Sequence, residues 1–217
     1  MTVLTLNIDG RYIETKKGRT VLDTALEAGI YIPHLCHHPD LTPVGGCGLC
    51  LVEVEGRQGL PTSCTIPVEE GMRVKTKTPQ VDRMRRLAME LILSGHPPEC
   101  TVCSQYLNCE LQSVKQYIGT AEELRVRRRS KPFPANAANP LFVHDPARCI
   151  RCGRCVRVCH DLRRVEVLSF KKKGKEAYIG TGSDSPLADA SCRFCGACVE
   201  VCPTGALRDK DELTKGK

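Results

Sequence analysis

The order of apolar and polar residues at the start of the chain predicts two strands and a helix. Leucine and isoleucine alternate with polar residues over residues 4–8, as in a half-buried strand, and the Asp9-Gly10 pair predicts a hairpin turn into a second strand. An apolar stripe at helical spacing then predicts a helix that begins after Thr20 and ends before Gly29. These elements are typical of a small α+β unit.

Three further elements follow in the first half of the chain. A third strand is expected over residues 51–55. A long helix comes next, with Thr78 as its cap, Pro79 at its first position, apolar residues at helical spacing, and Gly95 at its end. Residues 110–120 predict a second, shorter helix.

A change in composition divides the chain after these helices. Residues 121–140 mix basic residues, prolines and small residues, which is typical of an exposed linker, so a domain boundary is expected there. Beyond the linker, the apolar pairs Val165/Val167 and Ala177/Ile179 on either side of a lysine-rich turn predict a short β-hairpin. The expected domains are residues 1–78, 79–120 and 141–217.

Cysteine is the dominant feature of the composition. The chain holds 15 cysteines among 217 residues, but no tryptophan and only 4% aromatic residues, so its apolar cores would be thin and would need metals or disulfides as cross-links. The N-terminus lacks a secretory signal pattern, and no apolar run reaches the length of a membrane span. We therefore expect a cytoplasmic protein whose cysteines bind metal in a reducing compartment.

Four cysteines in the first unit have the spacing of a two-iron site, Cys36-x10-Cys47-x2-Cys50-x13-Cys64. Glycines beside the second and third cysteines allow backbone N–H groups to approach the sulfides of a cluster. The order of strand, hairpin, helix and cysteine loop resembles the β-grasp [2Fe-2S] ferredoxins, although the spacing departs from the plant-type pattern. A zinc ribbon is the alternative, but zinc sites usually pair two Cys-x2-Cys knuckles and this segment has one.

The next motif is His96-x3-Cys100-x2-Cys103-x5-Cys109. Three cysteines leave one position of a [4Fe-4S] cluster unfilled, and an imidazole nitrogen can fill it, as imidazole does on one iron of Rieske centres. The prolines after His96 fix the loop so that the ring and the thiolates converge. The alternative is a solvent-exposed histidine at a helix end, where the helix dipole favours it.

The last domain contains two complete cysteine quartets, Cys149-x2-Cys152-x2-Cys155-x3-Cys159 and Cys192-x2-Cys195-x2-Cys198-x3-Cys202-Pro203. In two-cluster ferredoxins the fourth cysteine of each run binds the other cluster. Cys202 is therefore expected to complete the [4Fe-4S] site of the first trio, and Cys159 that of the second. Crossed ligation holds the two clusters close together.

The four predicted sites use all fifteen cysteines and His96, and no thiol remains. Zinc, disulfide or redox-switch interpretations would leave several cysteines without a role, and free reactive thiols are oxidation liabilities. The other histidines are weaker candidates. A surface or supporting role is expected for His34, His37 and His38 beside Cys36, and His144 and His160 could donate hydrogen bonds that tune the last two clusters.

The net charge of +7 is compatible with nucleic acid, an anionic membrane or an acidic protein as partner. Basic residues concentrate in Arg125–Lys131 and Lys171–Lys175, which are interpreted first as solvated segments and second as docking sites for an acidic partner. A nucleic-acid role is disfavoured, because few aromatic residues are available for stacking and four clusters exceed a structural need.

The order of the sites, [2Fe-2S], His/Cys3 [4Fe-4S] and then two further [4Fe-4S], resembles the N-terminal region of the large iron-sulfur subunit of respiratory complex I. It is still more similar to the diaphorase iron-sulfur subunit of NAD-reducing [NiFe] hydrogenases and to the N-terminal module of multisubunit [FeFe]-hydrogenases. Similar subunits occur in NAD-linked formate dehydrogenases and electron-bifurcating transhydrogenases. The resemblance covers residues 4–207, and its His96 motif is the most discriminating part.

The expected function is one-electron transfer rather than catalysis. The chain has no G-x-G-x-x-G fingerprint after a strand and no P-loop, so neither nicotinamide nor flavin has a recognisable site. The resemblance implies a partner flavoprotein that binds FMN and NAD(P)H, a further catalytic or electron-accepting subunit, and possibly a ferredoxin. A free multi-cluster ferredoxin that diffuses between partners is the alternative.

Overall fold

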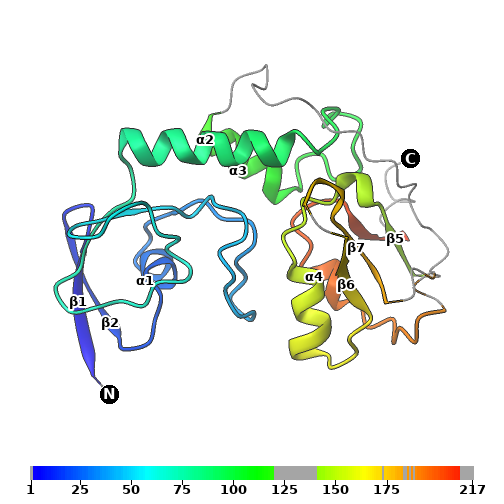
Figure 1. Cartoon of the computed structure of the whole chain (residues 1–217), viewed down its shortest axis with the longest axis horizontal. Helices are drawn as coiled ribbons and strands as arrows, with labels where there is room; N and C mark the ends of the chain where they lie inside the picture. The colour runs from blue at the N-terminus through cyan, green and yellow to red at the C-terminus, as the bar shows by residue number, and fades with distance from the viewer. Residues whose placement is uncertain are drawn as a thin grey trace.

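The computed structural model describes residues 2–119, 141–172, 174–182, 185, 187 and 189–210. The predicted linker with the basic run Arg125–Lys131 lies outside the described residues, as does the end of the chain after residue 210. No helix in the described part is long and apolar enough to cross a membrane. Figure 1 shows two units side by side, with α2 (Pro79–Leu93) and α3 (Glu110–Ile118) along the top of the molecule, above the first unit and reaching toward the second.

The first unit is built on a four-stranded mixed sheet with the strand order β2-β1-β4-β3. β1 pairs antiparallel with β2 and parallel with β4, and β3 pairs antiparallel with β4. The bounds are β1 Val3–Ile8, β2 Arg11–Lys16, β3 Glu53–Val54 and β4 Arg73–Lys75. β1 and β4, the first and last strands of the unit, are neighbours in the middle of the sheet. The segment that contains the four cysteines runs between them in the sequence and is therefore anchored to the sheet at both of its ends.

The hairpin and the first helix have the local features that their sequences predict. Asp9 and Gly10 have φ of 51° and 86°, as in the tight turns that connect antiparallel strands. α1 spans Val21–Glu27, and the Thr20 hydroxyl accepts a hydrogen bond from the Asp23 N–H at its start. The helix and the sheet enclose a core that includes Leu6, Ile8, Val21, Leu22, Ala25, Val52 and Val74.

Two features of this sheet differ from the sequence prediction. β3 is shorter than the strand expected over residues 51–55, because Leu51 instead forms an isolated bridge with Thr62. β4 is absent from the sequence prediction because its three residues offer one buried position, Val74, between two exposed basic side chains.

α2 and α3 follow the first unit in the sequence and precede the second. The Thr78 hydroxyl accepts a hydrogen bond of 3.2 Å from the Val81 N–H at the start of α2, as expected for a cap. In Figure 1, α2 extends across the top of the molecule with α3 beside it. Their shared core consists of Leu35, Leu49, Met89, Leu111 and Val114. Two of these residues come from the cysteine loop of the first unit, so the helix pair packs on that loop.

The second unit contains two small antiparallel sheets, β5 with β8 and β6 with β7, and several short helices. The bounds are β5 Phe142–His144, η1 Pro146–Arg148, α4 Arg154–Arg157, η2 Val158–Leu162, β6 Leu168–Lys171, η3 Gly174–Glu176, β7 Tyr178–Thr181, α5 Ala197–Glu200 and β8 Leu207–Asp209. α4 and α5 each contain the third cysteine of a Cys-x2-Cys-x2-Cys motif. The β5–β8 pair joins the two ends of the unit and closes it around these helices.

The hairpin of the second unit is shifted from its predicted position. Ile179 lies in β7 as expected, but Val165 and Val167 precede β6 and pack in the core instead. The Val165 N–H donates to the Cys159 carbonyl at 3.0 Å, which ties this segment to the first turn of η2 rather than to a neighbouring strand.

Candidate iron-sulfur cluster sites

The four cysteines of the first motif come together in the first unit: Cys36, Cys47, Cys50 and Cys64. The bridge between Leu51 and Thr62 sets Cys50 beside Cys64, and their Sγ atoms are 3.4 Å apart. The Cys50 carbonyl also accepts hydrogen bonds from the N–H and the hydroxyl of Ser63, at 2.9 and 2.8 Å. Backbone pairing therefore fixes two of the four sulfur atoms before any metal binds.

Hydrogen bonds among these thiols move their pKa values in opposite directions. Bonds from Cys47 and Cys64 lower the pKa of Cys36 to about 2, and a bond from Cys64 lowers the pKa of Cys50 to about 7. The same contacts raise the pKa of Cys47 and of Cys64. All four sulfur atoms thus belong to one connected group of soft donors, which suits iron and sulfide.

The backbone around Cys47 takes a shape that favours a bound anion. Gly45 and Gly48 have φ of 63° and 65°, a left-handed conformation that glycine adopts freely. Backbone N–H groups in such alternating conformations turn toward one side and form the concavities found at many iron-sulfur sites. A Cβ on Gly45 would lie 3.0 Å from the Thr62 hydroxyl oxygen, so this glycine is also required by close packing.

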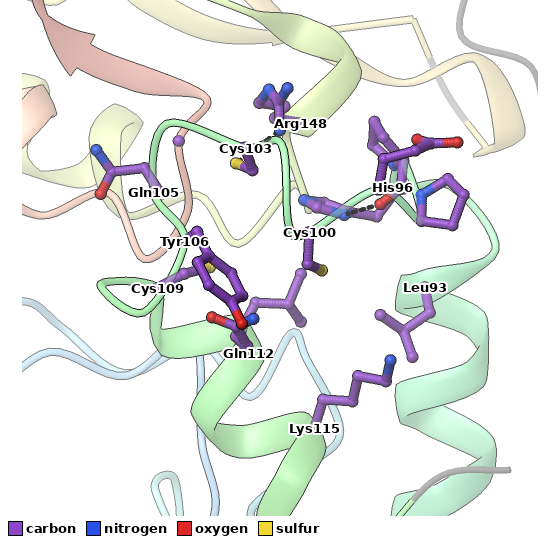
Figure 2. A pocket seen from close by; sticks show the side chains of 15 residues that line it. Leu93, His96, Cys100, Cys103, Gln105, Tyr106, Cys109, Gln112, Lys115 and Arg148 are labelled. Carbon is purple, nitrogen blue, oxygen red and sulfur yellow. Dashed lines mark hydrogen bonds between the residues drawn. The ribbon is translucent and has the colours of Figure 1, made fainter. Parts of the chain in front are cut away.

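The second motif lines a single cavity of about 240 Å³ between the end of α2 and the start of α3. Figure 2 shows the four predicted ligands around it: His96, Cys100, Cys103 and Cys109. The Cys103 N–H donates to the Cys100 carbonyl at 3.0 Å, which keeps these two residues on one turn. Burial, and then the nearby thiolates of Cys103 and Cys100, raise the pKa of Cys109.

The imidazole of His96 is oriented by its own loop. Its Nδ1 lies 2.9 Å from the carbonyl oxygen of Pro97 (Figure 2). A carbonyl oxygen can only accept, so Nδ1 carries the proton and Nε2 carries the lone pair. Histidines that bind metal commonly donate their other ring N–H to a backbone carbonyl in this way.

The His/Cys3 site borders the second unit. The Cys103 sulfur accepts a hydrogen bond of 2.7 Å from Arg148 Nη1, drawn as a dashed line in Figure 2. The Cys109 Sγ lies 3.7 Å from the carbonyl oxygen of Pro203, which also accepts from the Leu111 N–H at 3.4 Å. Pro203 directly follows Cys202, so this site adjoins one of the two quartets of the second unit.

The cysteines of the second unit form two groups, and the grouping is crossed. Burial, followed by the thiolates of Cys152, Cys149 and Cys202, raises the pKa of Cys155 well above its ordinary value. Burial and the thiolates of Cys192, Cys195 and Cys159 raise the pKa of Cys198 to about 12. The fold therefore brings Cys202 to the first trio and Cys159 to the second. The Cys198 thiolate also acts on Cys155, so the two groups are neighbours.

The two motifs of the second unit share one backbone conformation. Arg151 and Gly153 have φ of 59° and 73°, and the equivalent Phe194 and Gly196 have φ of 50° and 73°. Left-handed residues at these alternate positions turn the N–H groups of each loop inward, as around Cys47 in the first unit. A Cβ on Gly153 would also lie 3.1 Å from the Phe170 ring.

These features fit iron-sulfur clusters. All fifteen cysteines are free of disulfides. Burial raises the pKa of Cys152 to about 12 and that of Cys155 well above its ordinary value, so binding of a metal cation must displace the proton from each thiol. Among the described residues, no three His, Cys, Asp or Glu side chains converge on one point as the ligands of a single ion do. A polynuclear cluster spreads its ligands over several metal atoms and needs no such convergence.

Arginines, which the sequence analysis did not single out, connect the second unit to the other two sites. Arg154 is buried, 4% exposed, and donates to both carboxylate oxygens of Glu110, at 2.7 and 2.9 Å. Arg157 donates to the carbonyl oxygens of Cys36 and Thr42. One feature of the sequence could have indicated them: both arginines lie inside a cysteine motif, where a basic side chain is not expected to be solvated.

The remaining histidines take supporting positions. His37 Nε2 lies 3.2 Å from an Asp23 carboxylate oxygen, and burial lowers the pKa of His37. His144 is buried in β5, which lowers its pKa, and His160 Nε2 lies 2.7 Å from the Leu168 carbonyl oxygen. The His160 contact links η2 to the start of β6.

Three family profiles match successive parts of the chain. They are the 2Fe-2S iron-sulfur cluster binding domain over residues 1–79, the NADH-ubiquinone oxidoreductase-G iron-sulfur binding region over residues 85–123, and the NADH-quinone oxidoreductase subunit 3, ferredoxin-like domain over residues 139–208. The matches follow the order of the sites along the sequence.

Similar proteins cover nearly the whole chain. NADPH-Fe(3+) oxidoreductase subunit alpha of Geobacter sulfurreducens is 36% identical over 99% of this chain and 25% of its own length. NADP-reducing hydrogenase subunit HndD of Solidesulfovibrio fructosivorans is 37% identical over 98% of this chain and 37% of its own length. A chain in the crystal structure of NAD+-reducing [NiFe]-hydrogenase in the H2-reduced state matches with a TM-score of 0.87 and 31% identity, covering 95% of this chain and 87% of that chain.

Fold and sites together define a ferredoxin-like iron-sulfur electron-transfer protein with [2Fe-2S] and [4Fe-4S] domains. The chain spans only about a quarter to a third of the length of the two curated relatives above. It belongs to the family of iron-sulfur subunits of NAD(P)H-linked oxidoreductases, which includes the NADP-reducing hydrogenase relative and the matched chain of NAD+-reducing [NiFe]-hydrogenase. The resemblance drawn from the sequence is thereby confirmed.

Proposed function

We propose that the chain holds four clusters and conducts single electrons within an NAD(P)H-linked oxidoreductase complex. The proposed ligands are Cys36, Cys47, Cys50 and Cys64 for [2Fe-2S]; His96, Cys100, Cys103 and Cys109 for one [4Fe-4S]; Cys149, Cys152, Cys155 and Cys202 for the second; and Cys192, Cys195, Cys198 and Cys159 for the third. The domain division is a β-grasp [2Fe-2S] domain over residues 1–78, a helical His/Cys3 domain over 79–120 and a two-cluster domain over 141–217. The sheet order β2-β1-β4-β3 around α1 supports the β-grasp assignment.

The crossed grouping of cysteines in the second unit is the observation that carries this proposal. Cys155 lies within electrostatic range of thiolates from both quartets, so two clusters bound there are side by side. Bound iron-sulfur clusters accept and release one electron at a time. A structural role needs no such proximity, whereas electron transfer depends on it.

Contacts between the units support an order for the proposed sites in space. Arg157 joins the carbonyl of Cys36 to α4, which carries Cys155. Cys109 in turn lies against Pro203, next to Cys202. In this proposal the quartet completed by Cys202 lies between the two-iron site and the His/Cys3 site, although it comes later in the sequence.

The proposed partners are a flavoprotein that binds FMN and NAD(P)H and a further catalytic or electron-accepting subunit, possibly with a ferredoxin. The relatives support this proposal because their names place them in NADPH-, NADP- and NAD+-linked systems. Fifteen free thiols fit a reducing compartment, so the cytoplasm is the proposed location. A free multi-cluster ferredoxin stays as the second candidate, supported by the ferredoxin-like match over residues 139–208.

Anaerobic purification with an affinity tag tests the proposal. The isolated chain is expected to bleach with dithionite but not with NADH or NADPH, and to copurify with a flavin-containing subunit that restores bleaching by one of these nucleotides. A chain that elutes alone at low and high salt, yet exchanges electrons with several unrelated partners, would favour the free ferredoxin. A chain that oxidises NAD(P)H unaided would contradict both.

A further inference from the structure

Arg148 contacts one of the proposed cluster sites and directly precedes a proposed ligand of the next. Its Nη1 donates to the Cys103 sulfur of the His/Cys3 site at 2.7 Å, and it lines the same cavity as His96 (Figure 2). The next residue in the chain is Cys149, a proposed ligand of the neighbouring cluster. One side chain of the second unit thus reaches across to a ligand of the preceding domain.

Contacts to both the side chain and the backbone of Arg148 hold this residue in place. Arg148 Nε donates to Asp145 Oδ2 at 3.1 Å, and the Arg148 carbonyl accepts from the Thr204 hydroxyl at 3.0 Å. Gly205 passes so close that a Cβ there would lie 3.7 Å from Arg148 Cδ and 2.9 Å from Gln105 Cγ. The side chain is one-fifth exposed, so its position depends on these contacts rather than on solvent.

The charges around this contact do not cancel. Arg208 Nη1 also approaches Asp145 Oδ2, at 3.8 Å, so two guanidinium groups share one carboxylate. The group carries a surplus positive charge, and the cation closer to the cysteine points at its sulfur. A hydrogen bond and a cation at a ligand sulfur stabilise the reduced cluster, which is the more negative form, and so raise its reduction potential.

We propose that Arg148 is a positioning residue that sets the reduction potential of the His/Cys3 cluster and fixes that cluster against its neighbour. The proposal rests on the His/Cys3 ligation proposed above. A fork-shaped guanidinium can bind the Asp145 carboxylate and the Cys103 sulfur at once, which the single ammonium of lysine cannot do with the same geometry.

The test is an EPR-monitored redox titration of the whole purified chain carrying Arg148→Met. At a fixed potential, the ratio of reduced to oxidised His/Cys3 cluster is expected to fall at least tenfold, which corresponds to a shift of about 59 mV to more negative potential for a one-electron couple. The [2Fe-2S] signal, from a site that Arg148 does not touch, should keep its potential. Arg148→Lys, which keeps the charge, should shift in the same direction by less.

Arg208→Met is the matched control, because it removes the same charge and the same Asp145 partner without touching a sulfur. Equal potentials in the Arg148→Met and Arg208→Met proteins would overturn the proposal. If Arg148→Met binds less iron than the wild type, Arg148→Gln, which keeps a polar donor, replaces it in the same comparison.

His96→Cys identifies the EPR signal that belongs to the His/Cys3 cluster. If no signal responds to His96→Cys in the wild-type background, the ligation itself is wrong, which is a different failure.

Discussion

The two sheet-containing units are stabilised in different ways. The core of the first unit is mostly aliphatic, with side chains from β1, β3, β4, α1 and the loops between them, and two of its cysteines, Cys50 and Cys64, are buried in it. In the second unit the cysteines themselves form much of the core: Cys155 and Cys198 are buried among its apolar residues, with Cys149, Cys159, Cys192 and Cys202 packed against them. Its helices α4 and α5 have four residues each, far below the length at which a helix is stable alone.

This difference implies that metal has a different role in each unit. The first unit can bury apolar surface without iron, and its cluster is bound to an existing fold. In the second unit the buried thiols have pKa values raised by burial, and binding of a cluster supplies both the missing charge and the missing cross-links. We expect metal binding there to be coupled to folding, as in small structural metal domains.

Removal of iron gives the largest expected effect. After chelation under reducing conditions, amides of β5, α4, α5 and β8 should lose protection from hydrogen exchange, while those of β1, β2 and α1 should keep most of theirs. Mass-spectrometric hydrogen exchange on the apo and reconstituted chains measures both regions at once. Equal loss of protection in the two units would show that the proposed contrast is wrong.

Truncation of the aliphatic core tests the other side of the comparison. Leu22 is fully buried, so Leu22→Ala is expected to destabilise the first unit by about 3 kcal/mol, within the range for such truncations. The exchange rates of the first unit should rise accordingly, and the EPR signals of the second unit should persist. Loss of the second unit's clusters in this variant would mean that the two units fold as one.

The ion pair between Glu110 of α3 and Arg154 of the second unit is expected to contribute less. Glu110→Ala leaves the Arg154 cation buried without its partner, and the cost should be about 2 kcal/mol, below the usual range for a buried pair because Glu110 is 49% exposed. Glu27→Ala, at the exposed Arg19–Glu27 pair of the first unit, is the matched control and should cost less than about 1 kcal/mol. Denaturant unfolding of the holo protein compares the two variants. Equal costs would show that the Arg154–Glu110 pair stabilises the protein no more than an exposed ion pair does.

The smallest effect is expected from the loop glycines. Gly153 has φ of 73°, so Gly153→Ala should cost about 1–2 kcal/mol and loosen the nearby cluster without removing it. Gly182, where a Cβ would meet nothing within 4 Å and φ is not left-handed, is the control. Faster release of iron to a chelator from Gly153→Ala than from Gly182→Ala is the expected outcome, and equal rates would indicate that the loop shape does not hold the cluster.

Local signals made part of this molecule predictable. The Asp9-Gly10 turn, the Thr20 and Thr78 caps and the long α2 depend on neighbouring residues, and the structure contains all of them. Cysteine spacing likewise predicts the crossed ligation by Cys159 and Cys202, because that rule follows from the reach of a short loop, and this assignment stays a prediction.

What the sequence did not reveal depends on contacts between distant segments. β4 and the β5–β8 pair are three-residue strands that form only because another strand lies beside them. The contacts of Arg148 and Arg154 join residues more than forty positions apart, and a basic residue in a cysteine motif does not by itself name its partner.

Metal analysis of anaerobically purified protein tests the central claim most directly. If fifteen cysteines and His96 hold one [2Fe-2S] and three [4Fe-4S] clusters, each chain should contain about fourteen irons and about fourteen acid-labile sulfides. Full occupancy at about ten irons or fewer, or stoichiometric zinc in their place, would contradict it.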